Sequence, residues 1–290
     1  MSWFVNYLAH PVRSSPLNLI VARVIISLYA LWKIGTYPFG GLADFPEFLF
    51  MADTHAVQNQ FFAFPQPPVE WVRWEQGIIC LCLVLFGLGW RTGLTSVLAA
   101  FLLSHLSGLN YLIATEKTFL PIIYFLILYG LFRHELEGRP GVEAGVRKYR
   151  MSCLTWFLVG LSLLYFFTGF AKFKGGGWSF DWAAGSNLRA ILWHNAMYHI
   201  HETPPVMAWL LPHGLVCTII GWSTMALELG FAVAVLMRRS ITPFVLGLAG
   251  MHAGIVLTMQ VNYLGDFGVL YLTLIPWDDV VARWRRGTPA

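Results

Sequence analysis

Residues 165–182 read YFFTGFAKFKGGGWSFDW, and this stretch indicates where an apolar helix leaves a membrane. The apolar run ends in two lysines, three glycines and two tryptophans, which are Lys172, Lys174, Gly175, Gly176, Gly177, Trp178 and Trp182. Lysine and tryptophan are enriched where membrane helices meet the headgroup layer, because each combines an apolar body with a polar end. The glycines free the backbone to turn sharply. The stretch therefore predicts the end of a membrane helix followed by a tight turn.

Lys172 has two interpretations within this stretch. In the first, its long side chain reaches the headgroups and anchors the helix. In the second, its amine is partly desolvated among Phe170 and Phe173 and acts as a base. At 1.5 Å per residue from Cys153, Lys172 lies about 28 Å along its helix, which places it at the outer interface of the membrane. That position favours the anchoring interpretation.

The composition is typical of a membrane protein. Of the 290 residues, 57% are hydrophobic and only 12% are charged, which leaves too little polar surface to cover a water-soluble globule. The formal net charge of +4 does not indicate nucleic-acid binding, because the cations lie in short segments between apolar runs. The sequence therefore predicts an integral membrane protein with no nucleic-acid partner.

Eight apolar runs determine the expected fold. They cover residues 17–37, 71–90, 94–113, 119–132, 153–172, 214–237, 241–263 and 266–277. A helix needs about 20 apolar residues to cross a bilayer, and most of these runs approach that length. We therefore expect an all-α polytopic membrane bundle of about eight transmembrane helices, forming a single domain over residues 1–290. The last run is short, so it predicts either an eighth span or a re-entrant segment.

The connections between the runs predict the topology. If all eight runs cross, the basic connections fall on one side of the membrane, and these are residues 1–16, Arg91, residues 133–150, Arg238-Arg239 and the C-terminal tail. The acidic and histidine-rich connections fall on the other side. By the positive-inside rule both termini are then cytoplasmic. The expected location is a bacterial inner membrane.

Three of the ionisable residues inside the apolar runs mark candidate sites. Arg23 lies about 9 Å into the first run, where it either reaches the headgroups or pairs with an acidic residue. Glu228 and His252 each lie about 15–20 Å from the Arg238-Arg239 turn that joins their runs, so we expect them to meet at one depth. The same arithmetic places them about 10–15 Å deeper than Lys172, too far for a direct hydrogen bond. Each is either a functional group or a polar contact that holds helices together.

The cysteines and histidines are potential metal or haem ligands. The four cysteines form no C-x-x-C pair, so neither a disulfide framework nor a thiolate metal site is expected. His194, His199 and His201 lie close together, but no carboxylate-histidine motif accompanies them, and ordinary loop residues are the better interpretation. Haem ligation by His105 and His252 stays an open alternative, because both lie inside apolar runs. We therefore expect no metal site.

Several short motifs follow one another over nearly the whole chain. They are Arg23-Val24-Ile25, the turn Leu88-Gly89-Trp90-Arg91-Thr92 before a span ending in Asn110, Phe170-Ala171-Lys172-Phe173 with Trp178, Glu228-Leu229 followed by Arg238-Arg239, and His252. In their order and spacing the motifs resemble the horizontally transferred transmembrane (HTTM) family, the membrane portion shared with vitamin K-dependent gamma-carboxylase. The resemblance implies a helical membrane domain whose pocket opens on the non-cytoplasmic side, between the fifth, sixth and seventh spans.

The resemblance also implies a role for Lys172. In the carboxylase, a lysine three residues after a glycine is regarded as the base that deprotonates vitamin K hydroquinone, and Lys172 stands three residues after Gly169. Two positions differ from the carboxylase, because Ala171 replaces the first lysine of its segment and Lys117 stands where it has a functional histidine. The large luminal portion of the carboxylase is not expected to have a counterpart in this chain.

Two functional hypotheses follow. In the first, the protein is an oxidoreductase-like or carboxylase-like enzyme, in which a hydroquinone or other lipophilic ring donates electrons to oxygen. Lys172 is then the base, and Glu228 and His252 orient groups or relay protons. The residues expected around a bound quinone are Trp178, Arg189 and Arg23. In the second hypothesis the chain is a non-catalytic subunit that binds a quinone or lipid within a larger membrane complex. The expected partners are the lipid bilayer, a lipophilic small molecule and membrane proteins.

Overall fold

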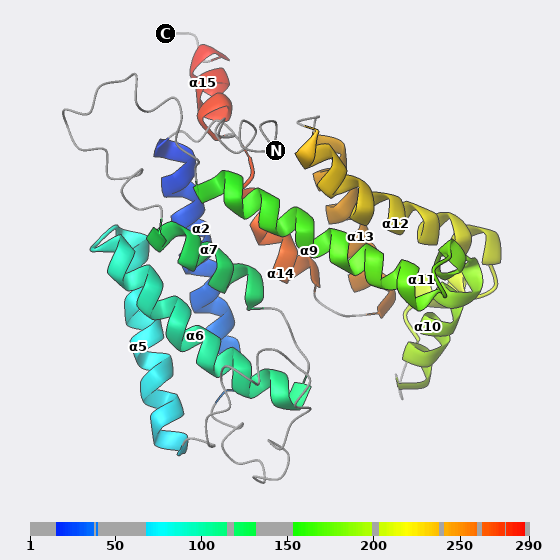
Figure 1. Cartoon of the computed structure of the whole chain (residues 1–290), viewed down its shortest axis with the longest axis horizontal. Helices are drawn as coiled ribbons and strands as arrows, with labels where there is room; N and C mark the ends of the chain where they lie inside the picture. The colour runs from blue at the N-terminus through cyan, green and yellow to red at the C-terminus, as the bar shows by residue number, and fades with distance from the viewer. Residues whose placement is uncertain are drawn as a thin grey trace. The chain divides into compact units, whose positions relative to one another are not determined.

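The computed structural model is all-helical over the residues that it describes, which are 16–37, 39, 68–114, 119–131, 153–198, 203–237, 241–259, 263–275 and 277–287 (Figure 1). The chain forms two compact units. One consists of Met1–Phe157 with Leu272–Ala290, and the other of Leu158–Tyr271.

The first unit is a bundle of helices that pack in chain order. Its helices are α2 (Pro16–Thr36), α5 (Val69–Leu88), α6 (Thr92–Ala114), α7 (Leu120–Leu131), the first residues of α9 (Cys153–Gly175) and α15 (Trp277–Gly287). α2 packs on α5, α5 on α6 and α6 on α7, and α5, α6 and α7 lie side by side in Figure 1. The contact between α6 and α7 is tight because a Cβ atom at Gly130 would lie 2.5 Å from Cγ2 of Val97. The buried rings of Phe86, Phe125 and Tyr129 pack against one another in this unit.

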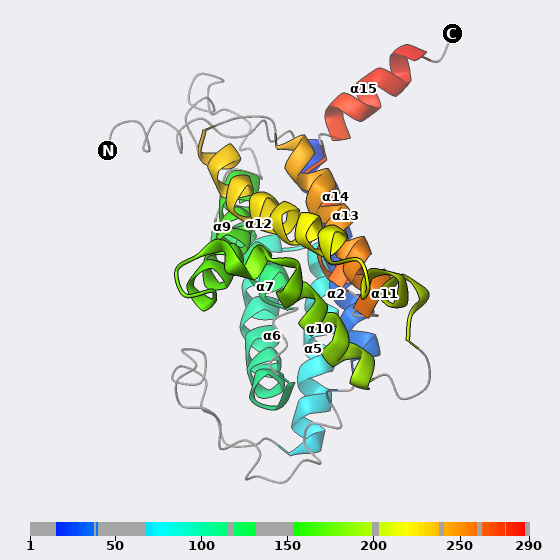
Figure 2. The same ribbon diagram turned by 90° about the vertical axis from the view of Figure 1, so that its right-hand side faces the viewer.

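The second unit is organised along α12 (Gly214–Leu236). It also contains most of α9, η3 (Phe180–Ala183), α10 (Gly185–Tyr198), α11 (Pro205–Leu210), α13 (Thr242–Met259) and most of α14 (Tyr263–Leu272). A Cβ atom at Gly185 would lie 2.4 Å from the carbonyl oxygen of Gly214, and one at Gly221 would lie 2.6 Å from that of Ala183. The segment between α9 and α10 therefore runs against the first two turns of α12. Figure 2 shows α10 beside α12, with which it packs.

Five helices of the described residues are long and apolar enough to cross a membrane. They cover Leu17–Thr36, Glu70–Leu88, Cys153–Gly175, Gly214–Leu236 and Thr242–Met259. Two further apolar helices, Thr92–Ser107 and Leu120–Leu131, are shorter. The expectation of a helical membrane protein is thus supported by helices of the required length and composition, at positions that the apolar runs predicted.

Two expectations about helix boundaries were wrong. The run 266–277 is not one helix, because α14 ends at Leu272 and α15 begins only at Trp277. A proline at position 276 explains the break, since the residue before a proline avoids helical backbone angles. The connection expected over residues 173–212 contains the last turn of α9 together with η3, α10 and α11. η3 and α10 mix polar and aromatic residues, and α11 is only six residues long, so no continuous apolar run revealed them.

Several expectations fall on residues outside those described. They concern most of the connection 38–70, the basic segments 133–150 and Arg238-Arg239, and the residues Lys117, His199 and His201.

Gly221 gives a direct test of the packing along α12. Replacing it with Ala places a methyl group 2.6 Å from the carbonyl oxygen of Ala183, and such overpacking costs about 1–3 kcal/mol. Gly250 of α13 is the matched control, because a Cβ atom there would meet nothing within 4 Å. Gly250→Ala should be neutral or stabilise by up to about 1 kcal/mol through helix propensity. Unfolding of both variants in mild detergent measures the difference, and equal effects would contradict this packing.

Candidate functional site

The site is built where α9 crosses α12. Gly169 of α9 is buried at this crossing, and a Cβ atom on it would lie 3.0 Å from the side chain of Leu229 and 3.1 Å from Cβ of Glu228. A larger residue would push the helices apart, whereas glycine lets the two backbones approach closely. Lys172 follows Gly169 by three residues and so lies on the same face of α9. The crossing therefore brings a lysine of one helix to a glutamate of the other.

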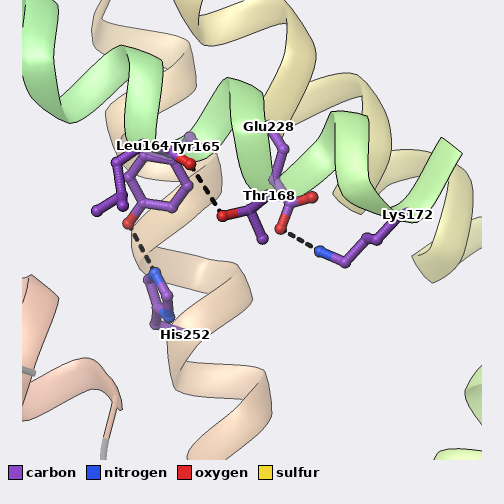
Figure 3. Close-up of polar contacts among 6 residues, drawn as sticks. All are labelled: Leu164, Tyr165, Thr168, Lys172, Glu228 and His252. Atoms are coloured by element: carbon purple, nitrogen blue, oxygen red, sulfur yellow. Dashed lines mark hydrogen bonds and ion pairs between the residues drawn. The ribbon is translucent and has the colours of Figure 1, made fainter. Parts of the chain in front are cut away.

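Lys172 and Glu228 form an ion pair in which the Lys172 ammonium donates a hydrogen bond to Oε1 of Glu228 (Figure 3). Glu228 is only 2% exposed, so its charge is almost entirely removed from solvent. The ammonium also lies 4.8 Å from the centre of the Trp182 ring, a cation–π distance. The second oxygen, Oε2 of Glu228, is buried and has no hydrogen-bond partner among the described residues.

This direct contact corrects the expected separation of Lys172 from Glu228. The expectation of a gap of about 10–15 Å assumed that α9 and α12 end at one level. In the structure, the segment after α9 covers the first two turns of α12, and Gly169 near the end of α9 contacts α12 at Glu228 and Leu229. The beginning of α12 therefore extends past the end of α9, and the offset brings the two charges together.

A second polar cluster lies on α9 about two helical turns before Lys172. The Tyr165 hydroxyl is 2.7 Å from Nε2 of His252 on α13 (Figure 3). It is also hydrogen-bonded to the hydroxyl of Tyr271 on α14. The His252 ring also stacks on Phe267, with ring centres 4.9 Å apart. Tyr165, His252 and Tyr271 are all buried. Three helices are thus joined by a chain of proton-bearing side chains.

The two clusters replace the expected meeting of Glu228 with His252. Glu228 pairs with Lys172, and His252 bonds to Tyr165, so each is held by a different residue of α9. Tyr165 and Lys172 are about 10 Å apart along the axis of α9. Tyr165, Gly169 and Lys172 have the spacing i, i+4, i+7 and share one face of α9. The functional groups therefore form a line along one helix face.

An aromatic patch adjoins the end of α9. Its members are Phe170, Phe173, Trp178, Phe180 and Trp222, linked by ring-to-ring distances from 5.0 to 6.1 Å. Four of the five are large exposed rings, and Phe180 stacks on Trp222 at 5.3 Å. The loop holds Trp178 at a positive φ of 62°, a conformation that is uncommon for a residue with a side chain. The patch offers flat apolar surfaces within a few residues of Lys172.

The three residues expected around a quinone are found in different surroundings. Trp178 belongs to the aromatic patch and is 62% exposed. Arg189 is an exposed residue of α10, on the side facing Gly214 at the start of α12. Arg23 belongs to the first unit, where its NH1 group lies 3.5 Å from the Tyr129 hydroxyl. Of the three, Trp178 is the one that packs beside the α9 residues described above.

Arg23 has a structural explanation in its own unit. A Cβ atom at Gly89 would lie 3.1 Å from the guanidinium of Arg23, so the cation sits at the C-terminal end of α5. Gly89 caps that helix with a φ of 89°. A cation at this position is favoured by the negative end of the helix dipole. The contact explains how Arg23 is accommodated within an apolar helix.

Sequence reasoning missed a polar pair in the first unit. Nδ1 of His105 on α6 lies 2.8 and 2.9 Å from the two carboxylate oxygens of Glu75 on α5. An imidazole and a carboxylate on two apolar runs that follow each other in the sequence could have suggested this pair. Within the described ranges, no group of three His, Cys, Asp or Glu residues could hold a metal ion. Cys80, Cys82, Cys153 and Cys217 form no disulfide with one another.

Compared with models of known families, with curated proteins and with solved structures, the chain shows no significant match.

The ion pair predicts a characteristic pattern of stabilities. Lys172→Met should destabilise the protein by about 2–4 kcal/mol, because it leaves the buried Glu228 carboxylate without its partner. Combining it with Glu228→Leu should restore stability to within about 1 kcal/mol of wild type, since both charges are then removed. Lys174→Met is the control, because Lys174 lies in the same last turn but is exposed. Unfolding of these three variants, of the Glu228→Leu single variant and of wild type in detergent gives the coupling, and additive effects would show that the two side chains do not interact.

Proposed function

We propose that this chain is a polytopic membrane protein that takes a proton from a lipophilic phenol of the hydroquinone class at the Lys172–Glu228 pair. The observation that carries the proposal is Oε2 of Glu228, a buried carboxylate oxygen with no partner among the described residues. A buried polar atom of this kind favours a ligand that supplies the missing hydrogen bond. A phenolic hydroxyl is a donor that also tolerates apolar surroundings.

The chemistry assigns different roles to the two charged residues. In the ion pair Lys172 is the cation and Glu228 the anion, so we assign the carboxylate as the proton acceptor of the pair. The phenolic O–H bond breaks, its proton moves to Oε2 of Glu228, and the negative charge of the phenolate is balanced by Lys172. Lys172 thereby becomes the electrostatic stabiliser of the anion instead of the base that the sequence suggested.

Oxidation can follow deprotonation if oxygen is the acceptor. A hydroquinone gives two electrons and two protons to O₂, which yields one quinone and one hydrogen peroxide, so atoms and electrons balance. Tyr165 and His252 supply a route for the second proton, because the tyrosine hydroxyl lies within hydrogen-bond distance of the imidazole. The aromatic patch provides stacking surfaces for the ring and its apolar tail.

The same features support the HTTM interpretation as part of this proposal. The lysine that the resemblance matches to the base of the carboxylase is the one that pairs with Glu228. Glu228 and Leu229, which belong to another of the matching motifs, lie against Gly169. We propose that the basic connections face the cytoplasm and that both termini lie on that side, as the positive-inside rule indicates. A bacterial inner membrane, which contains quinones, would then supply the substrate.

A quinol assay tests the proposed function. The purified protein is reconstituted in lipid nanodiscs with a decyl-substituted benzoquinol, and quinone formation and oxygen uptake are followed optically and with an electrode. Glu228→Gln should lower the protein-dependent rate by at least about a hundredfold, the scale of losing a general base. Lys172→Arg should keep the rate within about tenfold of wild type, because arginine preserves the cation but cannot accept a proton. Lys174→Met should have no effect.

Three results would contradict parts of the proposal. Loss of activity in Lys172→Arg with activity retained in Glu228→Gln would make Lys172 itself the base. Benzoquinol binding that depends on Glu228, without quinone formation, would identify a non-catalytic quinone-binding subunit. The absence of both binding and turnover in folded wild-type protein would reject a hydroquinone-class ligand.

A further inference from the structure

We infer that α15 is an interfacial helix that binds the anionic headgroup layer of the membrane with its apolar face. The inference does not depend on the proposed function. It rests on the pattern of residues along α15, on their exposure and on the way in which the chain attaches the helix to the preceding one.

The sequence of α15 is strongly amphipathic. Trp277, Val280, Val281 and Trp284 have the spacing i, i+3, i+4, i+7, which places them on one face of the helix. The positions between them are occupied by charged residues and one alanine, and the basic ones are Arg283, Arg285 and Arg286. No other helix of the described residues combines so narrow an apolar face with so polar an opposite side. This combination, with tryptophan on the apolar face and arginine on the polar face, is typical of helices that lie in a membrane interface.

The apolar face is largely open to solvent. Trp284 is 70% exposed and Val280 is 44% exposed, although α15 also packs against α2 of the same unit. In water this exposure would cost roughly 25 cal/mol for each square ångström of apolar surface left uncovered. A headgroup layer covers such a face and at the same time solvates the arginines.

The chain places α15 where a membrane surface is available. Nε1 of Trp277 donates a 2.9 Å hydrogen bond to the carbonyl oxygen of Leu272, the last residue of α14. The amide of Trp277 bonds to the carbonyl of Ile275 at 2.9 Å, so the link between the helices is a tight turn. α15 contains 11 residues, so it extends only about 16 Å from that point. Figures 1 and 2 both show α15 at the N-terminal end of α2, one of the five candidate spans.

The charge of the helix selects the lipid. Its two acidic residues, Asp278 and Asp279, lie in the first turn, where the positive end of the helix dipole stabilises negative charge. The three arginines lie in the last five residues, where they meet an anionic surface at about 1 kcal/mol each. An anionic phospholipid therefore fits this surface better than a zwitterionic one, and the attraction should weaken with salt.

Depth-dependent quenching in nanodiscs tests this inference with the full chain. A fluorescent label is attached to a cysteine at Val280, on the apolar face, or at Ala282, on the polar face, after replacement of the four native cysteines. With phosphatidylglycerol in the bilayer, nitroxide lipids should quench the label at 280 at least about threefold more than the label at 282. Iodide in the buffer should show the reverse order. If the cysteine-free protein does not fold, a genetically encoded fluorescent amino acid at the same two positions gives the same readout.

The lipid and the arginines supply the controls. Replacing phosphatidylglycerol with phosphatidylcholine, or replacing Arg283, Arg285 and Arg286 with glutamine, should reduce lipid quenching at 280 by at least about twofold. Equal iodide access at 280 and 282 in both bilayers would overturn the inference. Shielding at 280 that is independent of lipid and accompanied by self-quenching between labels would also overturn it, and would assign the face to a second copy of the chain.

Discussion

The structure of the second unit depends on the cost of placing a carboxylate inside an apolar helix. Glu228 interrupts a helix that is otherwise apolar enough to span a membrane, and it is almost completely buried. An unpaired charge in that environment is unfavourable by several kcal/mol, whereas a hydrogen-bonded partner offsets most of the loss. Lys172 can be that partner only because Gly169 lets α9 and α12 approach closely. The glycine at position 169 therefore determines whether the ion pair can form.

The same face of α9 connects this constraint to the rest of the unit. Tyr165 lies on that face and reaches α13 through His252 and α14 through Tyr271. Hydrogen bonds of this kind hold apolar helices in a fixed arrangement, because apolar packing alone gives little preference among partners within a membrane. They also place a tyrosine hydroxyl and an imidazole on the face of α9 that carries Lys172, about 10 Å from it along the helix. Stability and proposed chemistry thus draw on the same side chains.

Much of the fold could be predicted from the sequence because apolar runs have to become helices in a membrane. The runs containing Glu228 and His252 were located correctly, and both residues were recognised as candidates. Their partners were not, because residue counts give depth only if neighbouring helices end at one level. The offset between α9 and α12 comes from glycine contacts at positions 169, 185 and 221. No local pattern reveals which backbone each glycine approaches.

Other parts of the site left a signal that periodicity could have detected. Tyr165, Gly169 and Lys172 follow helical spacing, and this spacing alone is enough to place the tyrosine and the lysine on one helix face. Tyr271 left no such signal, because it lies on another helix and is brought in by tertiary packing alone. The break after α14 could have been predicted from Pro276, whereas η3 and α10 lack a continuous apolar pattern.

We expect Glu228 to be ionised in the bilayer, because the positive charge of Lys172 balances the negative charge of its carboxylate. Infrared difference spectroscopy of bilayer-reconstituted wild-type protein against Glu228→Gln isolates the carboxyl signal of this residue. The account predicts an ionised carboxylate band in the wild type, and its replacement by a protonated carboxylic acid band in a Lys172→Met background. A protonated band in the wild type that Lys172→Met leaves unchanged would contradict the account.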